Sequence, residues 1–147
     1  MDGAAVQVHG TSVEVDGIAV LLRGTPGSGK SDVALRLIDD GGKLVADDRT
    51  ELRREDRRLI ASSPAPIIGL LEVRGVGVMT VAAVDRSPLG LVVDLVAEED
   101  VERLPEAEFC SFLGLAVRRL RLPAFAASTP AKVRLAVAAL TQGIMPQ

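Results

Sequence analysis

A glycine-rich segment between an apolar run and a helical pattern constrains this chain more than any other feature. Residues 18–22 are continuously apolar, residues 24–31 read GTPGSGKS, and residues 30–40 repeat apolar side chains at helical spacing. The segment fits the pattern G-x-x-x-x-G-K-[ST], in which glycines let backbone N–H groups face phosphate oxygens and a helix N-terminus adds positive partial charge. The sequence therefore predicts a buried strand, a phosphate-binding loop and a helix in succession, within an α/β fold.

Every position of this loop is a predicted nucleotide contact. The contacts are Gly24, Thr25, Pro26, Gly27, Ser28, Gly29, Lys30 and Ser31. We expect Lys30 to reach the β- and γ-phosphates and the Ser31 hydroxyl to ligate Mg²⁺. The alternative interpretation is a tight strand-to-helix turn that binds nothing, which the length of the match and its flanking elements disfavour. The motif does not distinguish a kinase from an ATPase or a GTPase.

The rest of the chain shows mainly strand patterns, which predict a mixed β-sheet. Alternating residues near the N-terminus and the turn dipeptide Asp16-Gly17 indicate a hairpin before the buried strand. Glycines at 75 and 77 indicate a bend or a close backbone approach. Thr129-Pro130 opens a helix from 131 to about 142, and residues 104–113 are ambiguous. Further strands are expected at 43–46, 51–54, 57–60, 70–78, 79–84, 89–96 and 118–122.

Composition excludes several classes of protein. The chain has 147 residues with three Phe, no Tyr and no Trp, so its core must be aliphatic and it cannot present rows of stacking aromatics to single-stranded nucleic acid. The net charge of −3 argues against a basic nucleic-acid binder. One cysteine and one histidine can form neither an internal disulfide nor a Cys/His zinc site.

The N-terminal residues, the length of the apolar stretches and the chain length bear on targeting and domain number. The N-terminal residues Met1-Asp2-Gly3-Ala4 lack a basic region followed by an apolar run, and charges interrupt every apolar stretch well before a membrane-spanning length. We therefore expect a cytoplasmic protein with no membrane partner. The length fits a single catalytic domain over residues 1–147.

Two strand patterns end in aspartate and are candidates for the carboxylates that phosphoryl transfer requires. Asp47 and Asp48 follow residues 44–46, and adjacent like charges raise one pKa, which suits a proton acceptor beside a metal-bound neighbour. A simple strand-ending turn is the alternative there. Asp94 follows residues 91–93, but the apolar pattern continues beyond it, so we interpret Asp94 as structural.

Three further polar residues are ambiguous on pattern alone. His9 stands near the end of the first strand pattern, where a lone histidine is more often structural than catalytic. Glu72 and Arg74 are two residues apart in an apolar stretch, so a strand would place them on one face. They fit either a salt-bridged edge strand or a functional pair.

Together, four segments resemble the C-terminal catalytic domain of bacterial HPr kinase/phosphorylase. They are His9-Gly10, the loop 24–31, LVADD at 44–48 and LEVRGVG at 71–77. Many families share the loop, whereas the EVRGVG segment after an ADD-ending strand is far more specific. The resemblance is close from residue 9 to about 96 and looser to about 140.

The resemblance implies a nucleotide-binding core like that of phosphoenolpyruvate carboxykinase. It implies ATP- and Mg²⁺-dependent phosphorylation of a serine on HPr, the small phosphocarrier protein of the sugar phosphotransferase system. The roles carried over are phosphate binding by Lys30, Mg²⁺ ligation by Ser31 and Glu72 with Asp47 beside them, proton acceptance by Asp48, and active-site positions for His9 and Arg103. Full-length family members carry a further N-terminal domain and are hexamers, so a homo-oligomer is left open.

One departure from the family pattern bears on the reverse reaction. The family's phosphorolysis segment is rich in Arg and Gly, whereas residues 123–129 here, PAFAAST, contain no basic residue. Attack of inorganic phosphate on phosphoserine gathers several anions, and their repulsion requires positive charge. We therefore expect a kinase with weak or absent phosphorylase activity. The alternatives are a small-molecule kinase or nucleotide hydrolase on the same core, and a non-catalytic nucleotide-binding regulator.

Overall fold

The computed structural model describes residues 4–66 and 68–146, so the expectation drawn from residues 1–3 lies outside the described part of the chain. The chain begins with β1 (Ala5–His9), β2 (Thr11–Val15) and β3 (Ile18–Arg23). β2 and β3 form the expected hairpin, and its turn residues Asp16 and Gly17 have φ values of 50° and 82°. Two consecutive positive φ values match the right-handed twist of the flanking strands, which explains this turn sequence.

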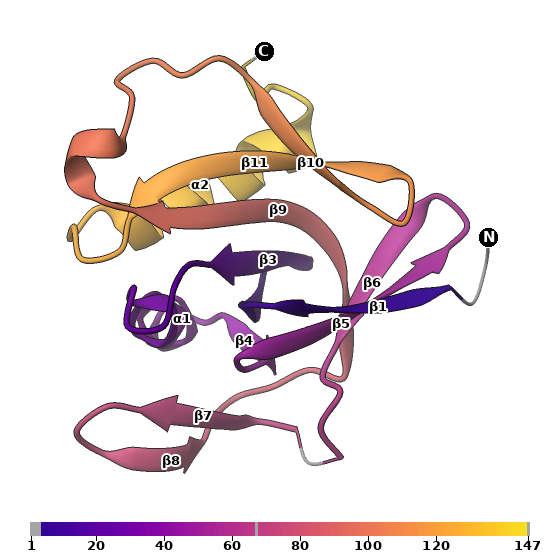
Figure 1. The fold of residues 1–147 in the computed structure, drawn as a ribbon, viewed down its shortest axis with the longest axis vertical. Helices are drawn as coiled ribbons and strands as arrows, with labels where there is room; N and C mark the ends of the chain where they lie inside the picture. The colour runs from indigo at the N-terminus through magenta and orange to yellow at the C-terminus, as the bar shows by residue number, and fades with distance from the viewer. Residues whose placement is uncertain (1–3, 67, 147) are drawn as a thin grey trace.

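The described residues form a nine-stranded mixed sheet that positions the loop (Figure 1). Its order is β1-β5-β6-β9-β3-β2-β4, with β11 beside β9 and β10 beside β11. β3 runs parallel to β9, and β9 parallel to β11, so three strands end at the same edge. The remaining strands are β4 (Lys43–Ala46), β5 (Arg49–Glu55), β6 (Arg58–Ser62), β9 (Arg86–Val96), β10 (Glu108–Phe112) and β11 (Leu115–Pro123).

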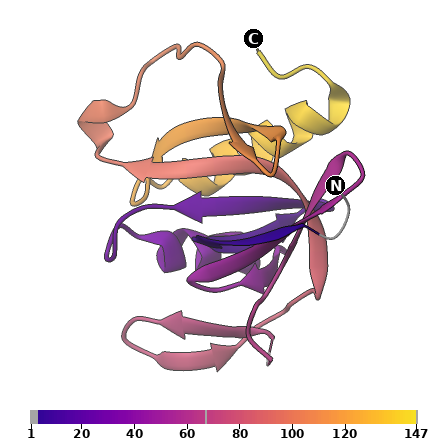
Figure 2. The ribbon, with the colours of Figure 1, turned by 45° about the vertical axis from the view of Figure 1, so that its right-hand side comes forward.

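Two helices pack on one face of this sheet. α1 (Lys30–Asp39) follows the loop directly, and α2 (Thr129–Gln142) ends the fold behind β9 and β11 (Figures 1 and 2). Val33 and Leu37 of α1 and Val137 of α2 are buried in one apolar cluster with Val20 and Leu22 of β3. The helix expected from 131 to about 142 is confirmed and begins two residues earlier, at Thr129, with Pro at its first turn, where the missing N–H costs nothing.

The opposite face of β3 is buried as well. Ala19 and Leu21 point into a second aliphatic cluster with residues of β5, β6 and β9. A strand covered on both faces reads as a continuous apolar run, and this explains the pattern at 18–22. The expected aliphatic core is confirmed, because the buried hydrophobic side chains are all Val, Leu, Ile or Ala.

The glycine-interrupted stretch 70–78 differs from the single bent strand that we expected. It forms a separate hairpin of β7 (Leu70–Val73) and β8 (Gly77–Thr80), seen at the bottom of Figure 2. Gly75 and Gly77 take φ values of 86° and 121°, which close the turn. The expected strand at 79–84 is wrong beyond Thr80, where the chain makes only an isolated bridge at Ala83.

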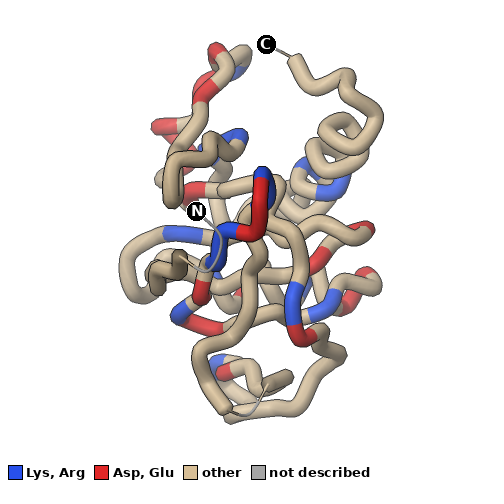
Figure 3. The backbone as a smooth tube through the Cα atoms, turned by 90° about the vertical axis from the view of Figure 1, so that its right-hand side faces the viewer, with Lys and Arg blue, Asp and Glu red and all other residues tan. Residues whose placement is uncertain are grey.

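Charged residues of both signs are intermixed along the backbone in Figure 3.

The ambiguous stretch 104–113 ends in β10, preceded by a short 3₁₀ turn, η1 (Glu98–Asp100), and a loop. Cys110 of β10 is a free, half-buried thiol, and burial raises its pKa. None of the helices in residues 4–66 and 68–146 has the length and apolar character needed to cross a bilayer.

Candidate active site

The loop connects the end of β3 to the start of α1 in a shape that requires glycine at two positions. Gly29 precedes the helix with a φ of 102°, and a Cβ there would lie 2.5 Å from the Cβ of Ala124. A Cβ at Gly24 would collide with the Ser28 side chain. The loop is closed by the Ser28 N–H, which donates to the Thr25 carbonyl at 3.0 Å. This tight cradle is the geometry in which backbone N–H groups meet phosphate.

Lys30 folds back over the loop. Its Nζ donates to the carbonyl oxygens of Gly24, at 2.8 Å, and Thr25, at 3.1 Å. An ammonium group has three donors, and both partners here are neutral carbonyls on an exposed loop. The charge of Lys30 is therefore held at the mouth of the cradle, and no carboxylate of the described residues forms an ion pair with it.

The buried Thr11 hydroxyl fixes the acidic pair at the end of β4. It donates to Asp47 Oδ1 at 3.1 Å and accepts the backbone N–H of Asp48 at the same distance. Asp47 Oδ2 in turn accepts the backbone N–H of Glu72 at 3.1 Å. Both oxygens of Asp47 thus receive hydrogen bonds from neutral donors, which orient its carboxylate without placing a positive charge beside it.

Asp48 adopts a left-handed backbone conformation with a φ of 66°. Its carbonyl accepts the N–H of Gly10 at 2.8 Å, which ties the turn to the start of β2. Non-glycine residues rarely take this conformation, and it turns the chain sharply from β4 into β5. Half-buried Asp47 and exposed Asp48 therefore project from successive positions at the same strand end.

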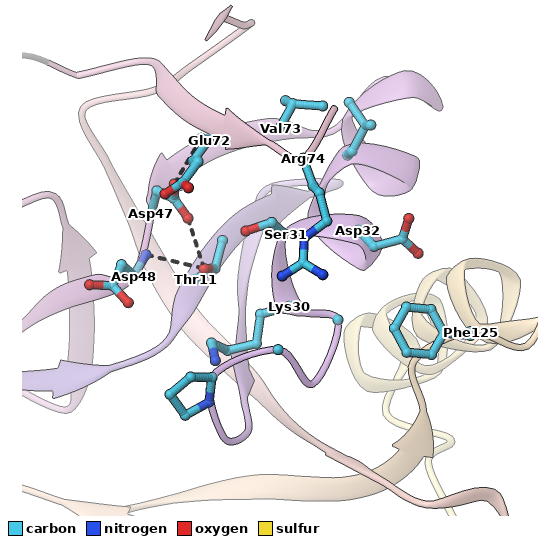
Figure 4. A pocket seen from close by; sticks show the side chains of 14 residues that line it. Thr11, Lys30, Ser31, Asp32, Asp47, Asp48, Glu72, Val73, Arg74 and Phe125 are labelled. Atoms are coloured by element: carbon cyan, nitrogen blue, oxygen red, sulfur yellow. Dashed lines mark hydrogen bonds between the residues drawn. The ribbon is translucent and has the colours of Figure 1, made fainter. Parts of the chain in front are cut away.

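The β7–β8 hairpin supplies the third carboxylate. Glu72 lies on β7 and Arg74 directly after it, and both side chains are exposed. No ion pair joins them within the part of the chain that the structure describes. Figure 4 instead shows the Arg74 guanidinium directed toward the space between Ser31 and Lys30.

These segments enclose one cavity of about 520 Å³ (Figure 4). Five separate parts of the chain line it: the start of β2, the loop with α1, the end of β4, the β7–β8 hairpin and the turn after β11. Of the predicted site residues, the structure brings together Pro26, Gly27, Gly29, Lys30, Ser31, Asp47, Asp48 and Glu72. Positive charge on the loop therefore faces three carboxylates across a single space.

The structure places five predicted residues outside this lining. Thr25 and Ser28 line the neighbouring cavity, and Gly24 lines neither. His9 is exposed at the end of β1, opposite Arg49 in the strand register. It precedes Gly10, whose N–H bonds Asp48, so His9 flanks the site without entering the cavity. Arg103 is exposed in the loop after η1 and lines neither this cavity nor the neighbouring one.

Asp94, which lies inside β9 two residues before its end, has a different environment. It accepts hydrogen bonds from Arg23 at 2.7 and 3.0 Å and another from Arg119. Burial alone would raise the pKa of Asp94, but the bonds and charges of both arginines outweigh burial and lower that pKa. Its interpretation as structural is supported, because both of its oxygens are already bound by cations.

Sequence reasoning missed three residues that shape the site. Thr11 looks like an ordinary strand residue and carries no motif. Phe125 lines the cavity from the turn after β11, and Arg36 of α1 bonds the carbonyls of Ala124 and Ala126 on either side of it. Only the tertiary fold brings these segments to the loop.

The donor set fits a hard divalent cation together with a nucleotide. Asp47, Asp48, Glu72 and the Ser31 hydroxyl offer oxygen ligands around one cavity. Among the described residues, no three His, Cys, Asp or Glu side chains are close enough to form a metal cage by themselves. Mg²⁺ ordinarily takes one or two carboxylates and completes its shell with substrate phosphates and water, so this set of oxygen donors suits Mg²⁺.

Comparison with known proteins agrees with this geometry. The family model described as HPr Serine kinase C-terminal domain matches residues 3–143. The chain belongs to this family. A solved structure of the Hpr(Ser) kinase/phosphatase from Coxiella burnetii superposes with a TM-score of 0.83 at 26% identity, covering 95% of this chain and 92% of that one. The expected mixed α/β fold with flanking helices is thereby confirmed.

Sequence relatives point the same way. HPr kinase/phosphorylase of Clostridium botulinum strain Eklund 17B is 35% identical over 128 residues, covering 80% of this chain. That of Listeria welshimeri is 49% identical over 77 residues, covering 52% of this chain. This chain spans 42% of the length of the first of these curated relatives and 25% of the second.

Proposed function

We propose that this chain is a protein-serine kinase that transfers the γ-phosphoryl group of ATP to a serine of HPr or an HPr-like phosphocarrier protein. The observation that carries the proposal is the single cavity in which the loop at 24–31 faces Asp47, Asp48 and Glu72. Phosphoryl transfer needs both halves of this arrangement, a cradle for the donor and carboxylates for the metal and the acceptor. Membership of the family supports the choice of substrate.

In the proposed reaction the loop binds the polyphosphate. Backbone N–H groups of residues 24–31 and the N-terminus of α1 stabilise its negative charge. Lys30 exchanges its two carbonyl partners for phosphate oxygens, which are stronger acceptors because they are charged. Lys30 then offsets the charge that develops on the β- and γ-phosphates.

Asp48 is the proposed proton acceptor. As the seryl oxygen bonds to the γ-phosphorus, the bond from that phosphorus to the β,γ-bridging oxygen breaks and ADP leaves with its electron pair. The seryl proton passes to the Asp48 carboxylate, which no described side chain neutralises. Thr11 positions this group through the Asp48 backbone N–H.

Ser31, Asp47 and Glu72 are the proposed ligands of Mg²⁺. When bound, the ion would neutralise phosphate charge and orient the γ-phosphoryl group. The hydrogen bonds from Thr11 and from the Glu72 backbone leave Asp47 able to accept a cation, because neither donor carries charge.

His9 and Arg103 enter the proposal as residues that contact the protein substrate. Both are exposed and stand outside the cavity lining, His9 next to the Asp48 turn and Arg103 in the loop after η1. Their side chains are therefore accessible to a docked partner rather than to the nucleotide. The chain itself is proposed to act as one catalytic domain over residues 1–147, in the cytoplasm, and its assembly state is open to a homo-oligomer.

The test is mass spectrometry of purified HPr after incubation with the chain and Mg·ATP. We expect HPr to gain one phosphoryl group on a serine, and Lys30→Ala to abolish the gain while leaving the fold intact by circular dichroism. Arg134→Ala, which removes a surface ion pair with Asp40, is the matched control. Release of free phosphate without labelled HPr would favour a nucleotide hydrolase. Binding of ATP without any transfer would favour a regulator.

The reverse reaction is proposed to be weak. The segment 123–129 has no basic residue of its own. Arg36 brings a guanidinium to it, but that group already bonds Asp32 and the carbonyls of Ala124 and Ala126. No uncommitted cation thus stands in this segment to receive a second phosphate. Rapid pyrophosphate release from seryl-phosphorylated HPr, Mg²⁺ and phosphate would refute this part of the proposal.

A further inference from the structure

A second cavity, of about 420 Å³, lies on the other side of the phosphate loop. Its walls come from the ends of three neighbouring parallel strands: the loop after β3, residues 95–98 at the end of β9, and residues 123–126 at the end of β11. In α/β sheets, ligands bind beyond the carboxyl ends of parallel strands. The proposed chemistry uses only the first cavity, so the second has no role assigned to it.

Phe125 stands between the two cavities and lines both. Its side chain is 71% exposed, although aromatic residues make up only 2% of the sequence. The ring lies against the loop, because a Cβ placed on Gly29 would be 3.0 Å from Phe125 Cζ. An exposed aromatic face beside a phosphate cradle is available for stacking.

Phe125 is held in this position from both sides. Arg36 donates to the carbonyls of Ala124 and Ala126, the two neighbours of Phe125 in the chain. Thr129 adds a hydrogen bond from its buried hydroxyl to the Pro123 carbonyl. The turn that carries the ring is therefore fixed to α1 and α2, and a fixed aromatic loses little conformational entropy when a ligand stacks on it.

We infer that the second cavity receives the base of the bound nucleotide, which stacks on Phe125 while the phosphates extend along the loop into the first cavity. This inference rests on the proposed nucleotide-binding function and specifies how that site holds the nucleoside. The cavity volume lies in the range of small-ligand sites. A nucleotide seated this way spans both cavities and crosses the cradle between them.

The residues that line the second cavity, the proposed base seat, also determine which bases it accepts. Leu95, Val96 and Pro123 give it aliphatic walls. Its polar side chains are the Thr25 and Ser28 hydroxyls and the Glu98 carboxylate, and it has no amide that would read the edge of a base with a paired donor and acceptor. Stacking is tolerant because every base presents a π face. ATP and GTP are therefore expected to bind with similar dissociation constants, and the base contributes affinity without strong selectivity.

The first experiment compares a nucleotide with a ligand that has no base. Dissociation constants of Mg·ATP, Mg·GTP and Mg·tripolyphosphate are measured by calorimetry for the wild type, Phe125→Ala and Phe109→Ala. Phe109 is the matched control, because it is also an exposed phenylalanine, at 56%, but lies on β10. We expect Phe125→Ala to weaken both nucleotides about tenfold, as loss of a base-stacking aromatic does, and to leave tripolyphosphate within twofold. Phe109→Ala should change none of the three.

The second experiment uses the absence of tryptophan from the chain. Phe125→Trp introduces a single tryptophan at the proposed seat, and a stacked base should quench its emission. We expect Mg·ATP and Mg·GTP to quench it at saturation and Mg·tripolyphosphate to leave it nearly unchanged. Equal quenching by all three ligands would overturn the inference.

These outcomes separate the inference from the proposed function. If tripolyphosphate and ATP both fail to bind the wild type, the nucleotide site itself is refuted. If both bind but Phe125→Ala changes their affinities equally or not at all, the function stands and the base seat is refuted. A thousandfold preference for ATP over GTP would refute the tolerant seat even if Phe125 proved necessary.

Discussion

Two strands of this sheet lead into aspartate after three apolar residues, yet the two regions do different things. β4 runs Leu44-Val45-Ala46 into Asp47 and Asp48, and β9 runs Leu91-Val92-Val93 into Asp94. Asp47 receives hydrogen bonds from a hydroxyl and a backbone amide. Asp94 receives them from two guanidinium groups. The three residues before the aspartate are alike, but β4 ends before Asp47 whereas β9 continues through Asp94, and the hydrogen-bond donors differ.

The charge of the donors decides which carboxylate remains available. Two arginines neutralise Asp94, and Arg119 continues the ion-pair chain to Glu108 and so to Arg121. Neutral donors orient Asp47 at the cavity without pairing it with a cation. A carboxylate held by dipoles is prepared to meet a cation or a proton, whereas one held by guanidinium groups serves as a structural link.

The largest effect is expected from Asp48→Asn. This change keeps the side-chain shape and removes the proposed proton acceptor, so kcat for HPr phosphorylation should fall by about 10³-fold. Binding of Mg·ATP, measured by calorimetry, should change less than threefold, because Asp48 is not proposed to hold the nucleotide. A variant with kcat near that of the wild type would exclude Asp48 as the base.

Asp94→Asn should instead change stability. It leaves Arg23 without its carboxylate partner and Arg119 with Glu108 alone, at 3.6 Å. We expect the free energy of unfolding to fall by about 2 kcal/mol at neutral pH, less than for a fully buried pair because these side chains are partly exposed. Urea unfolding measures this loss, and the kinase activity of the folded variant should be retained. If activity fell as far as in Asp48→Asn, the contrast between the two regions would fail.

The pH dependence of the same variant has a definite sign. The folded-state pKa of Asp94 lies below its ordinary value of 3.8, so its charged form stabilises the fold. That contribution is complete above the unfolded-state pKa and is lost as pH falls through the folded-state pKa. The stability difference between wild type and Asp94→Asn should therefore be constant from about pH 7 to pH 5 and shrink below about pH 4. A difference that widened in acid would contradict this assignment.

Much of the fold was predictable because local patterns and tertiary packing agree. The loop and its flanking elements follow directly from residues 18–40, and the Asp16-Gly17 turn takes the φ values its sequence favours. The stretch 70–80 was not predictable in detail. Glycines at 75 and 77 fit a bend as well as a turn, and only pairing of Leu71 with Met79 shows that the chain reverses there.

The site residues that belong to a sequence motif were predictable. Those that act only through long-range hydrogen bonds were not. Lys30, Asp48 and Glu72 belong to recognisable segments and line one cavity. Thr11 has no motif, and its importance arises from two hydrogen bonds to residues 36 and 37 positions away. Long-range partners of this kind are set by strand order, which single-sequence patterns do not specify.

Thr11→Val tests this positioning with a smaller effect. It removes one hydroxyl at nearly constant volume, so Asp47 loses a donor and the N–H of Asp48 loses its acceptor in a part-buried hydrogen bond. We expect kcat to fall about tenfold, and the free energy of unfolding to fall by about 1 kcal/mol, as for the loss of an ordinary hydrogen bond. Thr11→Ser keeps the hydroxyl and should restore kcat. A Thr11→Ser variant as slow as Thr11→Val would show that the methyl group, not the hydrogen bonds, matters.

The smallest effect is expected from Arg103→Ala. Because Arg103 is exposed and outside both cavities, its loss should leave the dissociation constant of Mg·ATP unchanged and raise KM for HPr about threefold, as for a charge at the rim of a transient interface. The rise should diminish at high salt, since exposed charges are screened. Arg57→Ala, on the exposed β5–β6 turn, is the control. If Arg103→Ala lowered kcat as far as Asp48→Asn does, the loop after η1 would have to close over the cavity during the reaction, and the division between nucleotide residues and partner residues would need to be redrawn.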